Sequence, residues 1–252
     1  MKYIKENWKF FVFAIVICII GAYFTTMYSI GLLDQSALDE AIKQVGSKES
    51  VIIVSMLQIA IYAATFCGFG IILSNKVGLW KKFEKNKVAI IATIIISVVA
   101  GLLISVVDKY VFGHFIEPVS HLYDSKPTLN YIIMSFTYGG VYEEILMRLF
   151  LMSLIAWIIS KIFCQKQKEI PVIVFVIANI IAALLFAAGH IPSTIQTFGY
   201  VNALILVRCF LLNGAFGLAA GWLYRKYGIG YAMLAHFGAH LVSKLIWFYL
   251  YN

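Results

Sequence analysis

The chain has 252 residues and a net charge of +8; 62% of its residues are hydrophobic and only 13% are charged. Soluble domains average about 45–50% apolar and about 25% charged residues, so this composition excludes an ordinary soluble domain and predicts a membrane protein. Lysine and arginine lie in short clusters between apolar runs, a pattern typical of membrane proteins, and we therefore expect no nucleic-acid partner.

Seven apolar runs are long enough to cross a bilayer, which takes about 20 helical residues. Because they lack the alternation of β-strands, we expect an all-α, polytopic transmembrane helical bundle of about seven helices, folded as a single integral-membrane domain over residues 1–252. The fourth run has 35 residues and is either one tilted helix or two pieces hinged at Gly139-Gly140, which would give eight elements. The runs are Phe10–Leu33, Val51–Ser74, Val88–Val107, Leu129–Phe163, Pro171–His190, Gly199–Leu223 and Gly228–Leu250.

The basic residues predict the orientation of this multi-pass protein in the cell membrane. The first run is too long for the core of a signal peptide, so we expect a retained transmembrane helix. A cytoplasmic N-terminus satisfies the positive-inside rule and leaves the C-terminus outside. The inner side then holds Lys2, Lys5, Lys9, Lys76, Lys81, Lys82, Lys85, Lys87, Lys161, Lys166, Lys168, Arg225 and Lys226, and the outer side holds only Lys43, Lys48, Lys109 and Lys126.

The connections between the runs leave no room for a soluble domain. The longest are Asp34–Ser50 and Asp108–Thr128, and neither is long enough to bury a core of its own. Two histidines of the second connection, His114 and His121, are therefore expected to be solvated. Any chemistry must lie on the membrane helices.

The fourth run carries three charges within Tyr142-Glu143-Glu144-Ile145-Leu146-Met147-Arg148. A charge at the centre of a membrane helix costs about 2.5–3.5 kcal/mol, which favours a functional reason for keeping three. Glu144 and Arg148 are four residues apart, share a helical face and can neutralise each other. Glu143 is rotated from Glu144 by about 100° and is free to act as a general base on water. A purely structural ion pair is the alternative.

Three histidines of the apolar runs supply further polar groups. His190 ends the fifth run, one turn after Phe186, although a histidine at a helix end is by itself typical of a membrane interface. In the last run His236 and His240 share a face and can orient a reacting group or bind a metal. The segment lacks the glutamate of the HExxH zinc motif. Lys244 continues this stripe, and we expect it to extend towards the outer interface.

Other polar and small residues of the runs have simpler interpretations. Arg208, in the sixth run, either covers a substrate carboxylate or pairs with an acidic neighbour, and the sequence favours neither. Gly217 and Gly221 form a GxxxG motif that predicts helix packing. The four cysteines form no CxxC pair, so neither a disulfide framework nor a thiolate metal site is expected.

Taken in order, Glu143-Glu144-x-x-x-Arg148, Phe186-x-x-x-His190 and His236 with a polar residue four later resemble the CPBP family. These are the CAAX-processing and bacteriocin-processing intramembrane endopeptidases, also called the Abi family. The resemblance covers roughly residues 130–245, the family-like catalytic core. It implies an endopeptidase that hydrolyses peptide bonds of membrane-associated proteins or peptides, such as prenylated tails, secreted peptide precursors or leader peptides.

The resemblance also implies a role for each residue. Glu143 would be the base that activates water, supported by the charges of Glu144 and Arg148 and by His190 as co-activator. Beside these roles, Phe186 and Arg208 are our candidate substrate-binding residues. His236 and His240 would stabilise the oxyanion. The family typically has Asn where this chain has His240. We expect glutamate-dependent catalysis without a cofactor; zinc bound by His190, His236 and His240 is the alternative.

Two other classes of protein could use the same groups. A proton-coupled or ion transporter would relay protons through the buried glutamates and histidines. The chain shows no internal repeat, which disfavours that interpretation. A non-catalytic immunity or scaffold protein would bind a peptide without cutting it, but the intact glutamates and histidines favour the enzyme. The expected partners are a peptide or protein substrate and the lipid bilayer, and the sequence does not indicate an oligomeric state.

Overall fold

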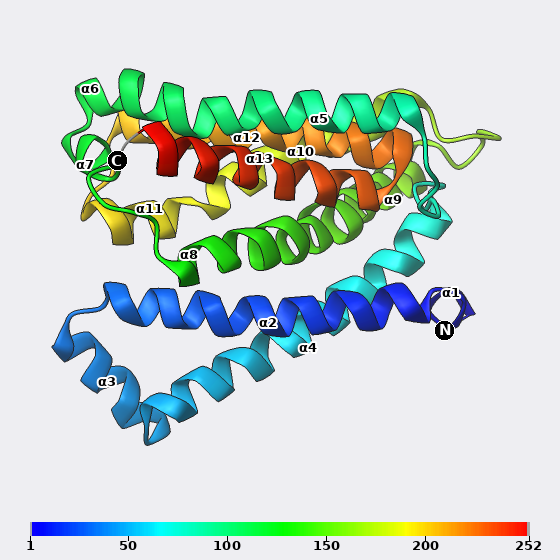
Figure 1. The fold of residues 1–252 in the computed structure, drawn as a ribbon. Coiled ribbons are helices and arrows are strands. Elements are labelled where there is room, and N and C mark those ends of the chain that lie inside the picture. The colour runs from blue at the N-terminus through cyan, green and yellow to red at the C-terminus, as the bar shows by residue number, and fades with distance from the viewer. Residues whose placement is uncertain (1, 251–252) are drawn as a thin grey trace.

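The computed structural model describes residues 2–250, and these residues are helical with no strand (Figure 1). This confirms the predicted all-α bundle. The elements in chain order are α1 (Lys2–Glu6), α2 (Trp8–Leu32), α3 (Gln35–Val45), α4 (Lys48–Lys76), α5 (Lys87–Leu102), η1 (Leu103–Phe112), α6 (Gly113–Phe115), α7 (Glu117–His121), α8 (Leu129–Met134), η2 (Ser135–Glu143), η3 (Ile145–Met152), α9 (Ser153–Phe163), α10 (Val172–Gly189), α11 (Ile191–Phe198), α12 (Ala203–Tyr227) and α13 (Ile229–Leu250).

Six helical spans within the described residues are long and apolar enough to cross a membrane. They are Trp8–Leu32, Lys48–Lys76, Lys87–Phe115, Leu129–Phe163, Val172–Phe198 and Ala203–Tyr227. The seventh expected span is present as α13, but it is not among the six, and the polar side chains of His236, His240 and Lys244 lower its hydropathy. Large apolar side chains such as Ile91, Ile94 and Ile95 remain exposed on the outside, where lipid would cover them.

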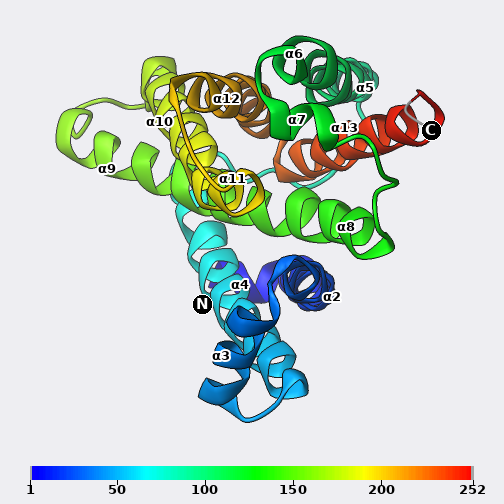
Figure 2. The ribbon, with the colours of Figure 1, turned by 90° about the vertical axis from the view of Figure 1, so that its left-hand side faces the viewer.

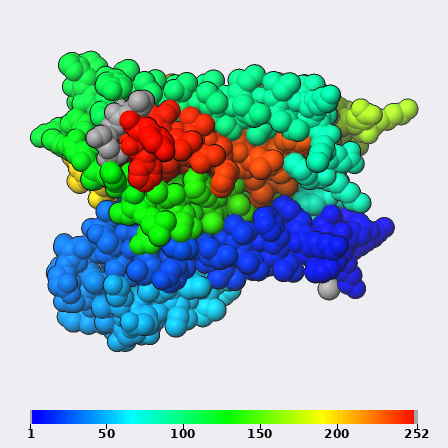
Figure 3. Space-filling view, in the orientation of Figure 1, coloured from blue at the N-terminus to red at the C-terminus, as the bar shows by residue number. Residues whose placement is uncertain are grey.

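Helices α2 and α4 form a layer on one side of the bundle, and the remaining long helices form the main body (Figures 2 and 3). Glycines let the helices approach closely. A Cβ added to Gly70 of α4 would lie 2.8 Å from Leu149, and one added to Gly101 of α5 would lie 2.6 Å from Val242 of α13. A Cβ at Gly217 would meet Ala183 of α10 at 3.0 Å, so the predicted GxxxG motif does serve helix packing.

The structure decides one open alternative and changes two of the predicted boundaries. The fourth span is one continuous helical segment, the first of its two alternatives, and is not hinged at Gly139-Gly140; both glycines lie in the π-helical segment η2. The third span does not end at Val107 but runs through η1 to Phe115. The connection Asp34–Ser50 is mostly helix α3, whose first turn is capped by the side chain of Asp34 at 2.8 Å from the Ala37 amide.

The two ends of the bundle differ in charge. One end carries α3, α7, α11 and the C-terminus of α13, on the left in Figure 1. The other end carries α1, the connection between α4 and α5 and the end of α9, together with most of the basic residues. Because α1 and the C-terminus of α13 lie at opposite ends, the arrangement agrees with the odd number of membrane crossings that the sequence predicts.

Candidate active site

The fourth span places the ion pair of Glu144 and Arg148 inside the bundle. Glu144 lies between the two π-helical segments and is fully buried, and Arg148 follows it by one turn at 1% exposure. A guanidinium nitrogen of Arg148 lies 3.1 Å from Glu144 Oε1. π-Helical turns occur frequently at functional sites, where the wider turn re-aims side chains. Here two such turns flank the buried carboxylate.

Aromatic rings hold Arg148 in place. Its guanidinium carbon lies 4.5 Å from the ring centre of Phe186 and 5.8 Å from that of Phe216. Such cation–π contacts contribute about 2 kcal/mol or more when the cation is desolvated. Phe186 also contacts His190 edge-on, with ring centres 4.7 Å apart. Phe186 is therefore a packing residue of the site itself.

Glu144 also orients a histidine from the last helix. His236 Nδ1 lies 2.8 Å from Glu144 Oε1, and the two residues are separated by 92 positions in the chain. Because a carboxylate paired with an arginine only accepts hydrogen bonds, Nδ1 carries the proton and donates it. This leaves Nε2 of His236 facing Glu143, at 3.9 Å from Glu143 Oε2. A carboxylate that fixes the tautomer and direction of an imidazole is the arrangement of a catalytic triad.

Glu143 and His190 reach the site from different helices. The Glu143 side chain keeps 20% exposure, in contrast with fully buried Glu144, which agrees with the predicted rotation between them. His190 caps the end of α10, and its Nδ1 lies 2.8 Å from the Phe186 carbonyl oxygen. Since a carbonyl only accepts, Nδ1 is the donor and Nε2 is left as the reactive nitrogen.

His240 stacks on His236, with ring centres 4.9 Å apart. The backbone of η2 closes its other side: a Cβ added to Gly139 would lie 2.9 Å from His240 Nε2. His240 Nδ1 is buried and has no hydrogen-bond partner within the described part of the chain.

A cavity of about 500 Å³ joins these groups. Glu143, His190, His236 and His240 all line it, together with residues of α2, α5 and α12. Three helical spans that are separate in sequence therefore supply these polar groups to one space. Counting residues along the spans suggests different depths for His190 and His236. The structure brings both to the cavity because α13 enters the bundle beside η2, as the contacts of His236 with Glu143 and Glu144 show.

Arg208 has the acidic neighbour that one of the two alternatives predicted. Its guanidinium forms two hydrogen bonds with Asp108, at 2.5 Å and 2.7 Å, and the Tyr123 hydroxyl donates to the same carboxylate at 2.9 Å. This pair explains why the third span continues past Asp108, because the charge is neutralised inside the bundle. The sequence analysis did not identify Asp108 or Tyr123, and only the presence of an unpaired Arg208 in an apolar run could have suggested an acidic partner. Both residues and Arg208 line the cavity.

The position of Lys244 contradicts the prediction from the sequence. It does not extend to the interface but is 4% exposed and lines the same cavity. The reason is that α13 packs along α5 and η2, so the stripe of His236, His240 and Lys244 faces inwards. His114 and His121 are exposed as expected, and hydrogen bonding to Asp124 at 2.8 Å raises the pKa of His121.

The described residues contain no group of three or more His, Cys, Asp or Glu side chains placed to hold a metal ion. Glu144 and the Phe186 carbonyl each occupy one ring nitrogen of a histidine in the proposed zinc set. These hydrogen bonds leave the Nε2 of both histidines free. The four cysteines are free thiols, as expected.

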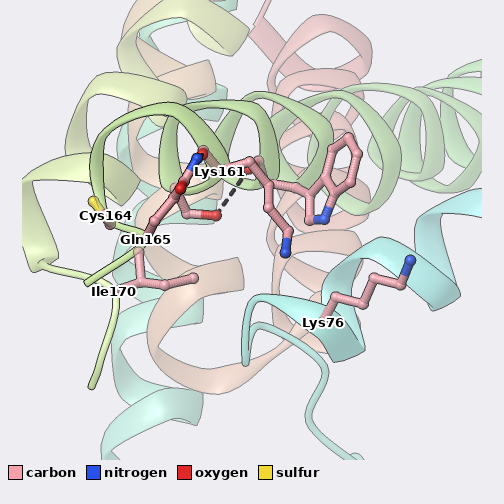
Figure 4. Close-up of a pocket in the computed structure, with 7 residues that line it drawn as sticks. Lys76, Lys161, Cys164, Gln165 and Ile170 are labelled. Atoms are coloured by element: carbon pink, nitrogen blue, oxygen red, sulfur yellow. Dashed lines mark hydrogen bonds between the residues drawn. The ribbon is translucent and has the colours of Figure 1, made fainter. Parts of the chain in front are cut away.

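A second hollow, of about 790 Å³, lies at the other end of the bundle (Figure 4). It is larger but holds none of the candidate residues. Its walls come from the ends of α4 and α9 and include Lys76, Lys161, Cys164, Gln165 and Ile170. The Gln165 amide donates a hydrogen bond to the Lys161 carbonyl, and the Ser160 hydroxyl donates one to the Trp157 carbonyl. Its lining includes no carboxylate and no histidine, so we place the chemistry in the smaller cavity.

Residues 125–242, just under half of the chain, match the family described as "Rce1-like: Type II CAAX prenyl endopeptidase Rce1-like". No curated protein and no solved structure gives a significant match. The matched segment runs from just before α8 to beyond His240 and confirms the resemblance to the CPBP family. Over these residues the chain is similar to CAAX-type intramembrane proteases, and its six long apolar spans indicate a multi-pass membrane protein.

Proposed function

We propose that this protein is an endopeptidase that hydrolyses peptide bonds with a water molecule activated by Glu143. One observation supports this most directly: the partly exposed carboxylate of Glu143 and the Nε2 of His236 lie 3.9 Å apart at one cavity, while Glu144 holds the other nitrogen of His236. The separation is suited to a water or a substrate oxygen that contacts both groups.

The proposed reaction needs no group beyond these side chains and water. Glu143 takes a proton from water, and the oxygen attacks the carbonyl carbon, whose double bond opens to an oxyanion. When His236 carries both ring protons, Glu144 accepts the one on Nδ1 and the one on Nε2 points to the cavity as a donor for the oxyanion. The C–N bond then breaks, and Glu143 returns its proton to the leaving amine. His190 offers a second acceptor for the water proton.

Purified protein and the variants Glu143→Gln and His236→Ala would be given a randomised peptide library, with and without a zinc chelator. We expect wild type to cut peptides with chelator present, and each variant to lose at least about 100-fold, because general-base and oxyanion contributions are each of that order. Glu40→Gln, which removes an exposed carboxylate on α3, is the matched control and should cut normally. Cleavage that survives Glu143→Gln would exclude the proposed base. Proton flux into liposomes that depends on Glu143 would instead favour a transporter.

We also infer from which side substrate enters. The cavity is lined by the last turns of α2, α5 and α10 and by exposed residues of α11, Ser193, Gln196 and Thr197. These lie at the end opposite the basic clusters (Figure 1). If the N-terminus is cytoplasmic, as the positive-inside rule predicts, the cavity opens outwards. Secreted peptide precursors and leader peptides then fit better than prenylated tails on the cytoplasmic side.

Labelling of intact cells tests this orientation. Ser193→Cys should react with a membrane-impermeant maleimide added outside, and Lys166→Cys, at the basic end, should react only after the membrane is permeabilised. The parent chain, whose own cysteines are mostly buried, supplies the background. The reverse pattern would place the cavity on the cytoplasmic side and favour prenylated tails.

A further inference from the structure

The hollow of about 790 Å³ at the basic end of the bundle takes no part in the proposed reaction (Figure 4). Four of its residues share one face of α9 and its C-terminal cap, because they are spaced at i, i+3, i+4 and i+7: Trp157, Ser160, Lys161 and Cys164. Lys76, the last residue of α4, lies beside them, with its Nζ 5.7 Å from the centre of the Trp157 ring. The hollow therefore lies where the layer of α2 and α4 meets the main body.

Two ammonium groups line this hollow, and the chain supplies neither with a counter-charge. The lining contains no Asp or Glu. None of the ion pairs within residues 2–250 involves Lys76 or Lys161, although Glu169 lies in the adjoining connection. Both lysines lie in the last turn of a helix, where the negative end of the helix dipole favours a cation. The hollow therefore presents two cations with which an anion from outside the chain can pair.

Other basic groups raise the positive potential at this end of the bundle. Lys81, in the connection between α4 and α5, donates a hydrogen bond to the Lys226 carbonyl at 2.7 Å. Burial and the nearby charge of Arg225 lower the pKa of Lys81. Cations held close to one another disfavour each other's charged form, and an anion bound at the same end relieves this repulsion. The charge distribution of this end therefore favours a negatively charged ligand.

The side chains next to the hollow indicate which kind of anion binds. Ile158 and Ile162 each follow a lining residue of α9 by one position, are rotated from it by about 100°, and are 41% and 61% exposed. On a membrane-spanning helix such side chains contact acyl chains, and tryptophans such as Trp157 gather at the level of the headgroups. A phosphate beside the two lysines, with acyl chains along Ile158 and Ile162, is the layout of an anionic phospholipid. A soluble phosphate would leave these apolar side chains uncovered.

We propose that this hollow binds the headgroup of an anionic phospholipid, whose phosphate pairs with Lys76 and Lys161 and whose acyl chains lie along the exposed apolar face of α9. Basic pockets between membrane helices are suited to such headgroups. The lipid joins the layer of α2 and α4 to the main body (Figure 2), because each of the two parts contributes one lysine. Since a ligand that binds only the folded state stabilises it, the protein should unfold at a higher temperature when this lipid is present.

Purified full-length protein in a neutral detergent would be titrated with short-chain phosphatidylglycerol, short-chain phosphatidylcholine and inorganic phosphate, with binding measured by native mass spectrometry and by thermal unfolding. Two double variants remove the same charge from the same end: Lys76→Gln, Lys161→Gln changes the hollow, and Lys166→Gln, Lys168→Gln leaves its lining intact. Phosphatidylglycerol should bind wild type and the control variant alike and raise their unfolding temperatures. The hollow variant should bind it about 25-fold more weakly, because each lysine near an anionic headgroup contributes about 5-fold.

Equal affinity of wild type for the two phospholipids overturns the proposal, because the hollow would then not select the charge. An equal loss in both double variants also overturns it, since that result indicates a diffuse attraction by the whole basic end. Inorganic phosphate that binds as tightly as phosphatidylglycerol would identify a soluble phosphate as the ligand in place of a lipid. Unfolding without lipid reports whether the hollow variant is folded; if it is not, the single variant Lys161→Gln should by itself bind about 5-fold more weakly, and unchanged binding contradicts the proposal. None of these measurements depends on cleavage of a peptide.

Discussion

The two buried ion pairs of the bundle have opposite characters. Glu144 and Arg148 are four residues apart on one helix, whereas Asp108 and Arg208 are 100 residues apart and join two helices. The Asp108 pair is fully matched, with two hydrogen bonds between the charges and a third from Tyr123. In the Glu144 pair, Glu144 Oε2 and both terminal nitrogens of Arg148 have no hydrogen-bond partner in the described residues, and Oε1 binds His236. The ion pair whose hydrogen bonds are all made joins two helices. The ion pair with unused donors and acceptors keeps polar groups that a functional site can use.

The largest expected effect comes from Glu144→Gln. The amide keeps the shape of the side chain but no longer has the charge that orients His236 and neutralises Arg148. We expect kcat/KM to fall by about 10²- to 10⁴-fold, the upper value being that known for the equivalent change in a serine protease triad. Measuring cleavage by protein shown to be folded in detergent checks this. A variant that cuts within a few-fold of wild type would show that the pair is only structural.

Asp108→Asn should reduce stability more than catalysis. It leaves Arg208 buried without its counter-charge, which typically costs about 3–5 kcal/mol. Thermal unfolding in detergent should show the loss, and the folded fraction should retain most of its activity. The double variant Asp108→Leu, Arg208→Met, which removes both charges, should recover stability. If instead both variants lost activity without losing stability, Arg208 would act on substrate, as the other of its two sequence-based interpretations predicts.

The smallest effect is expected from two neighbouring glycines that form a matched pair. Gly139→Ala would place a methyl group 2.9 Å from His240 Nε2, whereas Gly140→Ala would make ordinary contacts of 3.6 Å with Phe237. Gly139→Ala should therefore shift His240 and reduce kcat by about 10- to 100-fold, the cost of misplacing a catalytic group by about 1 Å. Gly140→Ala should change little. Equal kcat values in the two variants would show that the position of His240 does not matter for the reaction.

Much of the site could be predicted because its residues are local in sequence. The Glu144–Arg148 pair follows from helical periodicity, and so does the different environment of Glu143. The same reasoning was wrong for Lys244 and undecided for Arg208, because both depend on which side of a helix faces the bundle. Helices α12 and α13, which carry these two residues, are apolar on most faces, so their hydrophobic pattern does not indicate that side.

The amino-acid sequence by itself determined that this protein consists of membrane-spanning helices, that its basic residues gather at one end, and that two glutamates and an arginine share one span. These properties depend on composition and on the fixed geometry of a helix. Only the tertiary structure decided that His236 binds Glu144, that Asp108 neutralises Arg208 and that Lys244 faces the cavity. Each of these contacts depends on the rotation of one helix against another, which close packing at glycines and long-range charge pairing set and which no local pattern encodes.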